Sequence, residues 1–181
     1  LDLIAHEAAA LREKALEVYQ GSLIPSLRRA GVRLAKWGDI DPPAKQVLSS
    51  YFEAEIFPIC TPLALHPCPT FPFISNASLN LLVELEDGDE RRLGRVKVPG
   101  GMPRCLPVPG RRNTFILLEE VIKAHLPSLY PGMKVKGGHL FRVIRDADVE
   151  IRELEASDLI TAVEQTLRLR RMGAPVMLEA Q

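Results

Sequence analysis

The sequence predicts an α+β fold, in which N-terminal helices are followed by a mostly antiparallel sheet flanked by helices. Three features of the chain lead to this prediction. Apolar residues recur at helical spacing over much of the first 57 residues, prolines crowd residues 58–72, and apolar and polar residues alternate from residue 79. Helical periodicity followed by strand periodicity is expected where helices and strands occupy separate parts of a chain.

The first predicted helix covers residues 1–18 and carries a narrow apolar seam, which is typical of a helix that pairs with another helix. We expect Gly21 to end it. Ser22 would then cap a second helix that stops at Gly31. The seam should pack on the helix of residues 42–57 or on a second subunit. Its residues are Leu1, Ile4, Ala8, Leu11, Ala15 and Val18.

The next predicted helix starts at Asp41-Pro42, because a carboxylate cap followed by proline at the first position is a strong start signal. Pro58 should end this helix, since proline removes an amide donor. A wide apolar stripe predicts that one face is buried. The stripe residues are Ala44, Val47, Leu48, Tyr51, Phe52 and Ile56.

Residues 58–74 combine five prolines with large apolar side chains. Proline excludes both helix and central strand here. Flexible linkers are rarely so apolar. We therefore expect an extended segment that packs onto the fold.

Strand alternation starts at Leu79, and Asp87-Gly88 is a turn signal. A two-residue loop at 87–88 would place Val83 opposite Arg92. A loop of residues 87–90 instead places Leu81 opposite Val96 and keeps one face apolar, which is what fixes register. We prefer the second register, which also places Glu86 opposite Arg91.

The rest of the chain predicts shorter elements. We expect strands near Cys105, at 114–117, at 133–136 and 139–145 with Gly137-Gly138 between them, and at 176–178. Residues 118–126 predict a short helix, and Ser157 is a candidate cap for a last helix that stops at Gly173. Val149 and Ile151 would extend the sheet.

Composition excludes several classes of protein. Lys and Arg number 23 and so do Asp and Glu, and this zero net charge argues against a dedicated nucleic-acid binder. The chain has neither an apolar run long enough to span a membrane nor a signal peptide. Three cysteines suit a reducing compartment, so we expect a cytoplasmic protein. Because the chain begins with Leu1, we interpret it as an excised piece of a longer protein or a processed one.

Two groups of residues have chemistry that could suit a metal site. Cys60, His66 and Cys68 match no common zinc spacing, and buried thiols beside an exposed histidine explain them as well. Asp146, Asp148 and Glu150 alternate and could hold Mg²⁺, but a solvated strand end is the more ordinary interpretation. No nucleophile–base pair and no phosphate-loop motif is recognisable, so we assign no catalytic residue and no metal ligand.

Basic residues offer a further hypothesis. Strand alternation puts Arg91, Arg95 and Lys97 on one face, and a polyanion needs little more than a row of positive charge. The candidate polyanion contacts are therefore Arg91, Arg95, Lys97 and Arg104, with a solvated surface as the alternative. Other basic side chains could converge with them: Arg92, Arg111, Arg112, Arg168, Arg170 and Arg171.

An ordered series of short motifs resembles the middle, or head, domain of bacterial-type polyphosphate kinase. The motifs are EIFP at 55–58, TPLA at 61–64, FPFISN at 71–76, SLNL at 78–81, RVKVP at 95–99 and RRMGAPV at 170–176. The chain departs from the family pattern at His66, where the family has Asp, and at Pro69-Thr70, where it has His-Pro. We carry over no role for those positions.

The resemblance implies a reaction that the residues alone do not show. Polyphosphate kinase reversibly transfers the terminal phosphate of ATP to polyphosphate, with Mg²⁺, through a phosphorylated histidine. In the family, that histidine and the adenine contacts lie in other domains, while the head domain contributes to dimerisation and to the polyphosphate channel. The resemblance therefore implies a homo-oligomer whose partners are polyphosphate and the rest of the kinase chain, and it implies no cofactor in this fragment.

We expect one compact domain, with a helical part at residues 1–57 and the α+β head domain proper at 58–181. We expect this chain alone to be inactive. A stand-alone, non-catalytic module that binds phosphate-rich ligands or a partner protein is the alternative function.

Overall fold

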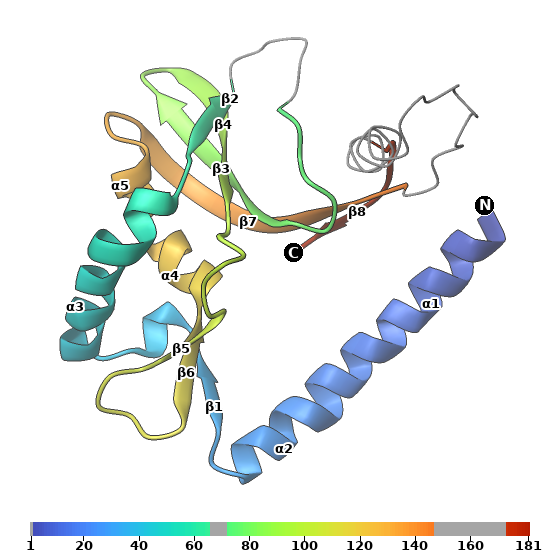
Figure 1. Cartoon of the computed structure of the whole chain (residues 1–181), viewed down its shortest axis with the longest axis horizontal. Coiled ribbons are helices and arrows are strands. Elements are labelled where there is room, and N and C mark those ends of the chain that lie inside the picture. The colour runs from blue at the N-terminus through green and yellow to red at the C-terminus, as the bar shows by residue number, and fades with distance from the viewer. Residues whose placement is uncertain (1, 66–71, 147–172) are drawn as a thin grey trace, which may run out of the picture.

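A computed structural model describes residues 2–65, 72–146 and 173–181 (Figure 1). Within these ranges the chain forms two sheets and a set of helices, so the α+β prediction is confirmed. The expected strand extension at 149–151 and the expected last helix from Ser157 lie outside the described residues.

The N-terminal helices form one uninterrupted helical run. Helix α1 (Asp2–Val18) continues through a π-turn, η1 (Tyr19–Leu23), into α2 (Ile24–Arg29). The predicted stop at Gly21 and the predicted cap at Ser22 are therefore wrong. The wide turn immediately precedes Pro25, whose ring would clash with the carbonyl four residues earlier in a regular helix. The predicted end at Gly31 is confirmed, since this residue has φ +78°.

The seam of α1 does not pack on the 42–57 helix. Leu11 is 67% exposed, and Leu3, Ile4, Leu16 and Val18 are also exposed. In the view of Figure 1, helix α1 is separated from α3 and runs from α2 toward the side where β8 lies. Among the described residues, one ion pair involves α1, between Arg12 Nε and a Glu179 carboxylate oxygen at 3.4 Å. Packing of this seam on the 42–57 helix is thus a wrong expectation, and packing on a second subunit stays a prediction.

Helix α3 (Pro42–Tyr51) starts where the sequence predicts. The Asp41 side chain accepts a hydrogen bond from the Ala44 amide at 3.0 Å, which satisfies one of the free donors of the first turn. The helical path continues through a π-turn, η3 (Phe52–Ile56), and a 3₁₀ turn, η4 (Phe57–Ile59). Most of the predicted stripe is buried, but Val47 is 55% exposed.

The larger sheet has five antiparallel strands in the order β2-β4-β3-β7-β8. Their bounds are Leu63–Leu65 for β2, Leu79–Asp87 for β3, Glu90–Lys97 for β4, Lys134–Arg145 for β7 and Pro175–Ala180 for β8. Strand β7 is continuous through Gly137-Gly138, which replaces the two strands that the sequence predicts. A register shift opposite Glu84 and Leu85 absorbs the irregularity.

The hairpin of β3 and β4 has the predicted register. Leu81 faces Val96, and Glu86 faces Arg91. The loop itself is shorter than predicted, because Asp87 pairs with Glu90 and only residues 88–89 lie between the strands. Gly88 supplies the positive φ of +62° that this tight turn needs.

The second sheet is not predicted by the sequence. It has three strands, β1 (Arg33–Ala35), β6 (Thr114–Leu117) and β5 (Cys105–Pro107), with β1 parallel to β6. A 3₁₀ turn, η2 (Trp37–Asp39), links β1 to α3. Helices α4 (Leu118–Ala124) and α5 (Leu126–Leu129) follow β6.

One core joins the helical part to both sheets. Helices α3, α4 and α5 gather on one side of the larger sheet (Figure 1). Phe52 and Ile56 from the helical part are fully buried with Leu81 and Val96 from the sheet and Ile122 from α4. The division at residue 57 stays a prediction.

The proline-rich segment begins in the 3₁₀ turn η4 and continues into the short strand β2, and residues 73–76 are attached to the sheet by two arginines. Arg95 donates to the Phe73 carbonyl oxygen at 3.3 Å. Arg145 donates to the Ile74 carbonyl oxygen at 2.7 Å, and its guanidinium lies 4.5 Å from the centre of the Phe73 ring. Ile74 packs with Phe141 and Val143 on the sheet face opposite the main core.

Candidate functional site

The four candidate polyanion contacts do not form one row. Arg95 is only 8% exposed and donates through Nε to the Asn80 side-chain oxygen at 2.9 Å. Burial lowers the pKa of Arg95 from its usual value. Because this charge lies inside the protein and holds residue 73, Arg95 is a structural residue rather than a surface contact.

Arg91 is exposed, at the hairpin end of β4 opposite Glu86. The Glu86 carboxylate accepts from Lys136 at 2.8 Å, and that hydrogen bond is the main reason that the pKa of Glu86 lies below its ordinary value. Nearby Arg92 pairs with Asp87 and Glu90 at 3.1 and 3.0 Å. The hairpin end therefore mixes both signs of charge.

Lys97 and Arg104 line one hollow, which we call the basic cavity. It has a volume of about 680 Å³ and lies between residues 75–79, the end of β4, residues 98–104 and the paired strands β7 and β8. Arg142 lines it as a third cation, and Glu179 lines it as an anion. Lys97 is exposed, and no ion pair or hydrogen bond holds its side chain among the described residues.

The two arginines of the basic cavity are held in place. Arg104 donates through Nη2 and Nε to the Glu119 carboxylate at 2.6 and 3.0 Å. Glu119 is 2% exposed, and its hydrogen bond raises the pKa of Arg104. Arg142 donates through Nε to Glu179 at 2.6 Å. The cavity thus has two fixed guanidinium groups and one free ammonium group.

Sequence reasoning missed Arg142 and Glu179. The feature that could have identified them is a cross-strand ion pair, because Arg142 faces Glu179 in the β7–β8 register. This signal becomes visible only once the register is known.

The other constellations remain incomplete in the described residues. Cys60 is buried, and burial raises the pKa of its thiol, whereas His66 and Cys68 lie outside the described residues. Asp148, Glu150, Arg168, Arg170 and Arg171 also lie outside them. The parts of the chain that the structure describes hold no cluster of three His, Cys, Asp or Glu residues suited to a metal. They also hold no helix that could span a membrane.

Two described histidines have structural partners. His125 lies between the Val121 carbonyl oxygen at 2.8 Å and the Ser49 hydroxyl at 2.9 Å, and its ring stacks on Phe52. His139 lies 3.0 Å from a Glu84 carboxylate oxygen on an exposed strand face. Neither of these histidines lines the basic cavity.

The fold and cavity therefore define an α+β domain with a cavity that three basic side chains line. Residues 44–181 match the family described as polyphosphate kinase middle domain. Because this match covers most of the chain, the chain belongs to the polyphosphate kinase middle-domain family.

Individual relatives agree with this assignment. The chain is 38% identical over 191 residues to polyphosphate kinase from Mycobacterium ulcerans, covering 99% of this chain and 26% of the relative. It is 37% identical over 195 residues to polyphosphate kinase from Mycobacterium tuberculosis strain H37Rv, with the same coverage. The chain thus spans about a quarter of the length of these curated relatives.

The fold matches a crystal structure of polyphosphate kinase from Porphyromonas gingivalis with a TM-score of 0.68 and 28% identity. The match covers 81% of this chain and 25% of that one.

Proposed function

We propose that this chain acts within a full-length polyphosphate kinase as a non-catalytic domain that contacts polyphosphate and contributes to dimerisation. The full-length enzyme would reversibly transfer the terminal phosphate of ATP to polyphosphate, with Mg²⁺. ATP, Mg²⁺ and the phosphorylated histidine would belong to other parts of that enzyme.

The basic cavity is the observation that supports polyphosphate contact. Lys97, Arg104 and Arg142 place three cations around about 680 Å³, against one lining carboxylate that already pairs with Arg142. A hollow with an excess of one sign of charge attracts ligands of the opposite sign. Polyphosphate carries negative charge along its whole length, so it fits this chemistry.

The apolar seam of α1 supports the contribution to dimerisation. Its residues Ile4, Leu11 and Val18 are exposed on a helix that does not pack on α3. A helix seam of this kind is stabilised by pairing with another helix.

The test measures polyphosphate binding to the 181-residue chain over a series of salt concentrations. Lys97→Glu should weaken binding by about tenfold at an ionic strength of about 20 mM, because it reverses the free cation of the cavity. Arg91→Glu is the matched control, since Arg91 is exposed on the same strand and does not line the cavity. It should change the affinity by less than about threefold. Equal losses in both variants would mean nonspecific attraction and would contradict the proposal.

A further inference from the structure

A second cationic hollow lies beside the smaller sheet, and we call it the arginine hollow. It has a volume of about 380 Å³ and is lined by Arg28, Arg33, Arg111, Asp39, Thr114 and the wall of β1. It shares no lining residue with the basic cavity. Inferences about it therefore do not rest on the proposed function.

The local fold brings the three arginines together from three segments. Arg28 lies in the last turn of α2, and Gly31 then reverses the chain with φ +78°. Strand β1 begins at Arg33, whose amide donates to the Asn113 carbonyl oxygen at 2.9 Å. This parallel pairing with β6 sets Arg33 opposite Thr114, beside the loop that carries Arg111.

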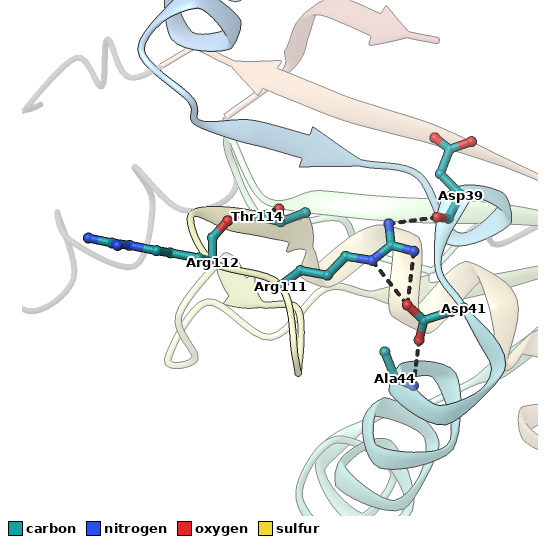
Figure 2. Close-up of polar contacts among 6 residues, drawn as sticks. All are labelled: Asp39, Asp41, Ala44, Arg111, Arg112 and Thr114. Atoms are coloured by element: carbon teal, nitrogen blue, oxygen red, sulfur yellow. Dashed lines mark hydrogen bonds and ion pairs between the residues drawn. The ribbon is translucent and has the colours of Figure 1, made fainter.

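Arg111 is fixed by the start of α3 (Figure 2). Its Nε donates to an Asp41 carboxylate oxygen at 3.1 Å and its Nη1 to the Asp39 carbonyl oxygen at 3.0 Å. Its Nη2 lies 2.9 Å from the same Asp41 oxygen. Guanidinium has five N–H donors, so two remain available. Arg112 extends away from this cluster in Figure 2.

The other two arginines are not neutralised. The side chains of Arg28 and Arg33 are exposed and have no ion-pair or hydrogen-bond partner in the described residues. Asp41 balances the charge of Arg111, and Asp39 is the one acidic side chain that lines the hollow. Three cations against these two carboxylates leave the hollow positive.

We propose that the arginine hollow is a binding site for a phosphate-type oxyanion. Guanidinium groups present paired N–H donors that match the oxygens of phosphate, and such charge-assisted hydrogen bonds are stronger than neutral ones. Arg111 is the preorganised donor, and Arg28 and Arg33 supply the uncompensated charge. Its volume has room for a phosphate group or a short phosphate chain, and the assignment to an oxyanion rests on the guanidinium groups.

The experiment follows backbone amide chemical shifts of the 181-residue chain during titration with tripolyphosphate at about 20 mM ionic strength. Arg33 and Thr114 report on the arginine hollow, and Lys97 and Arg142 report on the basic cavity. Saturable shifts at Arg33 and Thr114 are expected. In the double variant Arg28→Gln, Arg33→Gln, the shift at Thr114 should require at least about tenfold more ligand, whereas the shift at Lys97 should keep its midpoint.

The matched control is the double variant Arg29→Gln, Arg112→Gln. It removes the same charge from the same neighbourhood, but neither side chain lines the hollow, and Arg29 instead donates to Ser26 at 3.0 Å. The control should stay within about threefold of the unmodified chain. Arg111 is left unchanged in both variants, so the support of α3 is kept.

Two results would overturn the proposal. One is the absence of a saturable shift at Arg33 and Thr114 up to about 1 mM tripolyphosphate. The other is an equal loss in the two double variants, which would reveal only a general positive field. Loss of the Lys97 response alone would count against the proposed function and leave this proposal standing.

Parallel titrations distinguish the sources of the oxyanion. Orthophosphate that binds as tightly as tripolyphosphate would identify a site for a free phosphate group. Long-chain polyphosphate that binds more than about tenfold tighter per chain would identify a site for one unit of a polymer, because multivalent chains gain effective concentration. Citrate that competes equally well would contradict the assignment to phosphate.

Discussion

Arg95 and Arg104 have different roles although they have the same side chain. Arg95 uses its donors on Asn80 and on the Phe73 carbonyl, so its charge fastens the proline-rich segment to the sheet. The side chain of Arg104 is 62% exposed, yet its guanidinium pairs with the buried Glu119 while lining the basic cavity. Local sequence patterns cannot distinguish these roles, because the roles depend on contacts with residues far away in sequence.

The Arg104–Glu119 pair yields a stability prediction. Arg104→Met should lower the free energy of unfolding by about 1–3 kcal/mol, because it leaves the carboxylate of Glu119 buried without its partner. We expect the lower part of this range, since water reaches the arginine side of the pair. Urea unfolding monitored by circular dichroism measures the loss. Adding Glu119→Gln should recover part of it, because a neutral amide is easier to bury than an unpaired charge.

Arg92→Met is the control for this measurement. Arg92 pairs with two carboxylates, Asp87 and Glu90, and both ion pairs lie at the surface of the hairpin. The Arg92→Met substitution should lower the free energy of unfolding by less than about 1 kcal/mol. If the two methionine variants lost equal stability, burial of Glu119 would not be the cause.

Elements with strong local signals could be predicted from the sequence. Asp41-Pro42 fixes the start of α3, and Leu81, Val83 and Leu85 fix the hairpin register because a shift of one residue would expose all three. The signals were weaker elsewhere. Gly21 reads as a helix stop, but a π-turn carries the helix through it, and three-residue β1 is too short to show periodicity.

Asp41, at the start of α3, makes contacts whose strength depends on pH. The Ala44 amide and then the Arg111 guanidinium hold the pKa of Asp41 below its ordinary value of 3.8. The ionised carboxylate is therefore favoured in the folded state. Its contribution to stability is present above the unfolded pKa and is lost as the pH falls through the lower folded pKa.

Asp41→Asn should consequently lower the melting temperature at neutral pH, because an amide caps well but cannot pair with Arg111. The difference from the unmodified chain should shrink as the pH falls below the ordinary pKa of Asp41 and disappear once the pH is below the lower folded-state pKa. Thermal melts across this range measure it. Asp89→Asn is a suitable control, since Asp89 lies in the exposed turn between β3 and β4. A difference that stayed constant with pH would contradict the ionic contribution.

At the scale of the whole molecule, the candidate site depends on tertiary contacts that no local pattern encodes. Lys97 and Arg104 come together because residues 98–104 fold back beside β7 and β8. Gly94 has a similar explanation, since a Cβ there would lie 2.7 Å from the buried ring of Tyr130. Alternation placed Gly94 on a strand face correctly but gave no reason for glycine.

The hollows of the molecule are adjacent. A middle hollow of about 410 Å³ shares Arg104 with the basic cavity and Arg28 with the arginine hollow. Cations therefore recur from the β4 end to the α2 end of the domain. Glu119 and Glu120 also line the middle hollow, and neither His125 nor His139 lines any of the three.

The last prediction follows from that arrangement. The 181-residue chain alone should form no polyphosphate from ATP and Mg²⁺, because phosphoryl transfer needs several fixed cations around the γ-phosphate and, by family resemblance, a histidine nucleophile. The ring of His125 is hydrogen-bonded to Ser49 and to the Val121 carbonyl oxygen, and the ring of His139 is hydrogen-bonded to Glu84. Purified chain is incubated with ATP and Mg²⁺ and assayed for polyphosphate and for a phosphohistidine adduct. Turnover that disappears on changing His6, His66, His125 or His139 would place an active site in this chain, whereas product that forms only with the full-length kinase would support a non-catalytic role.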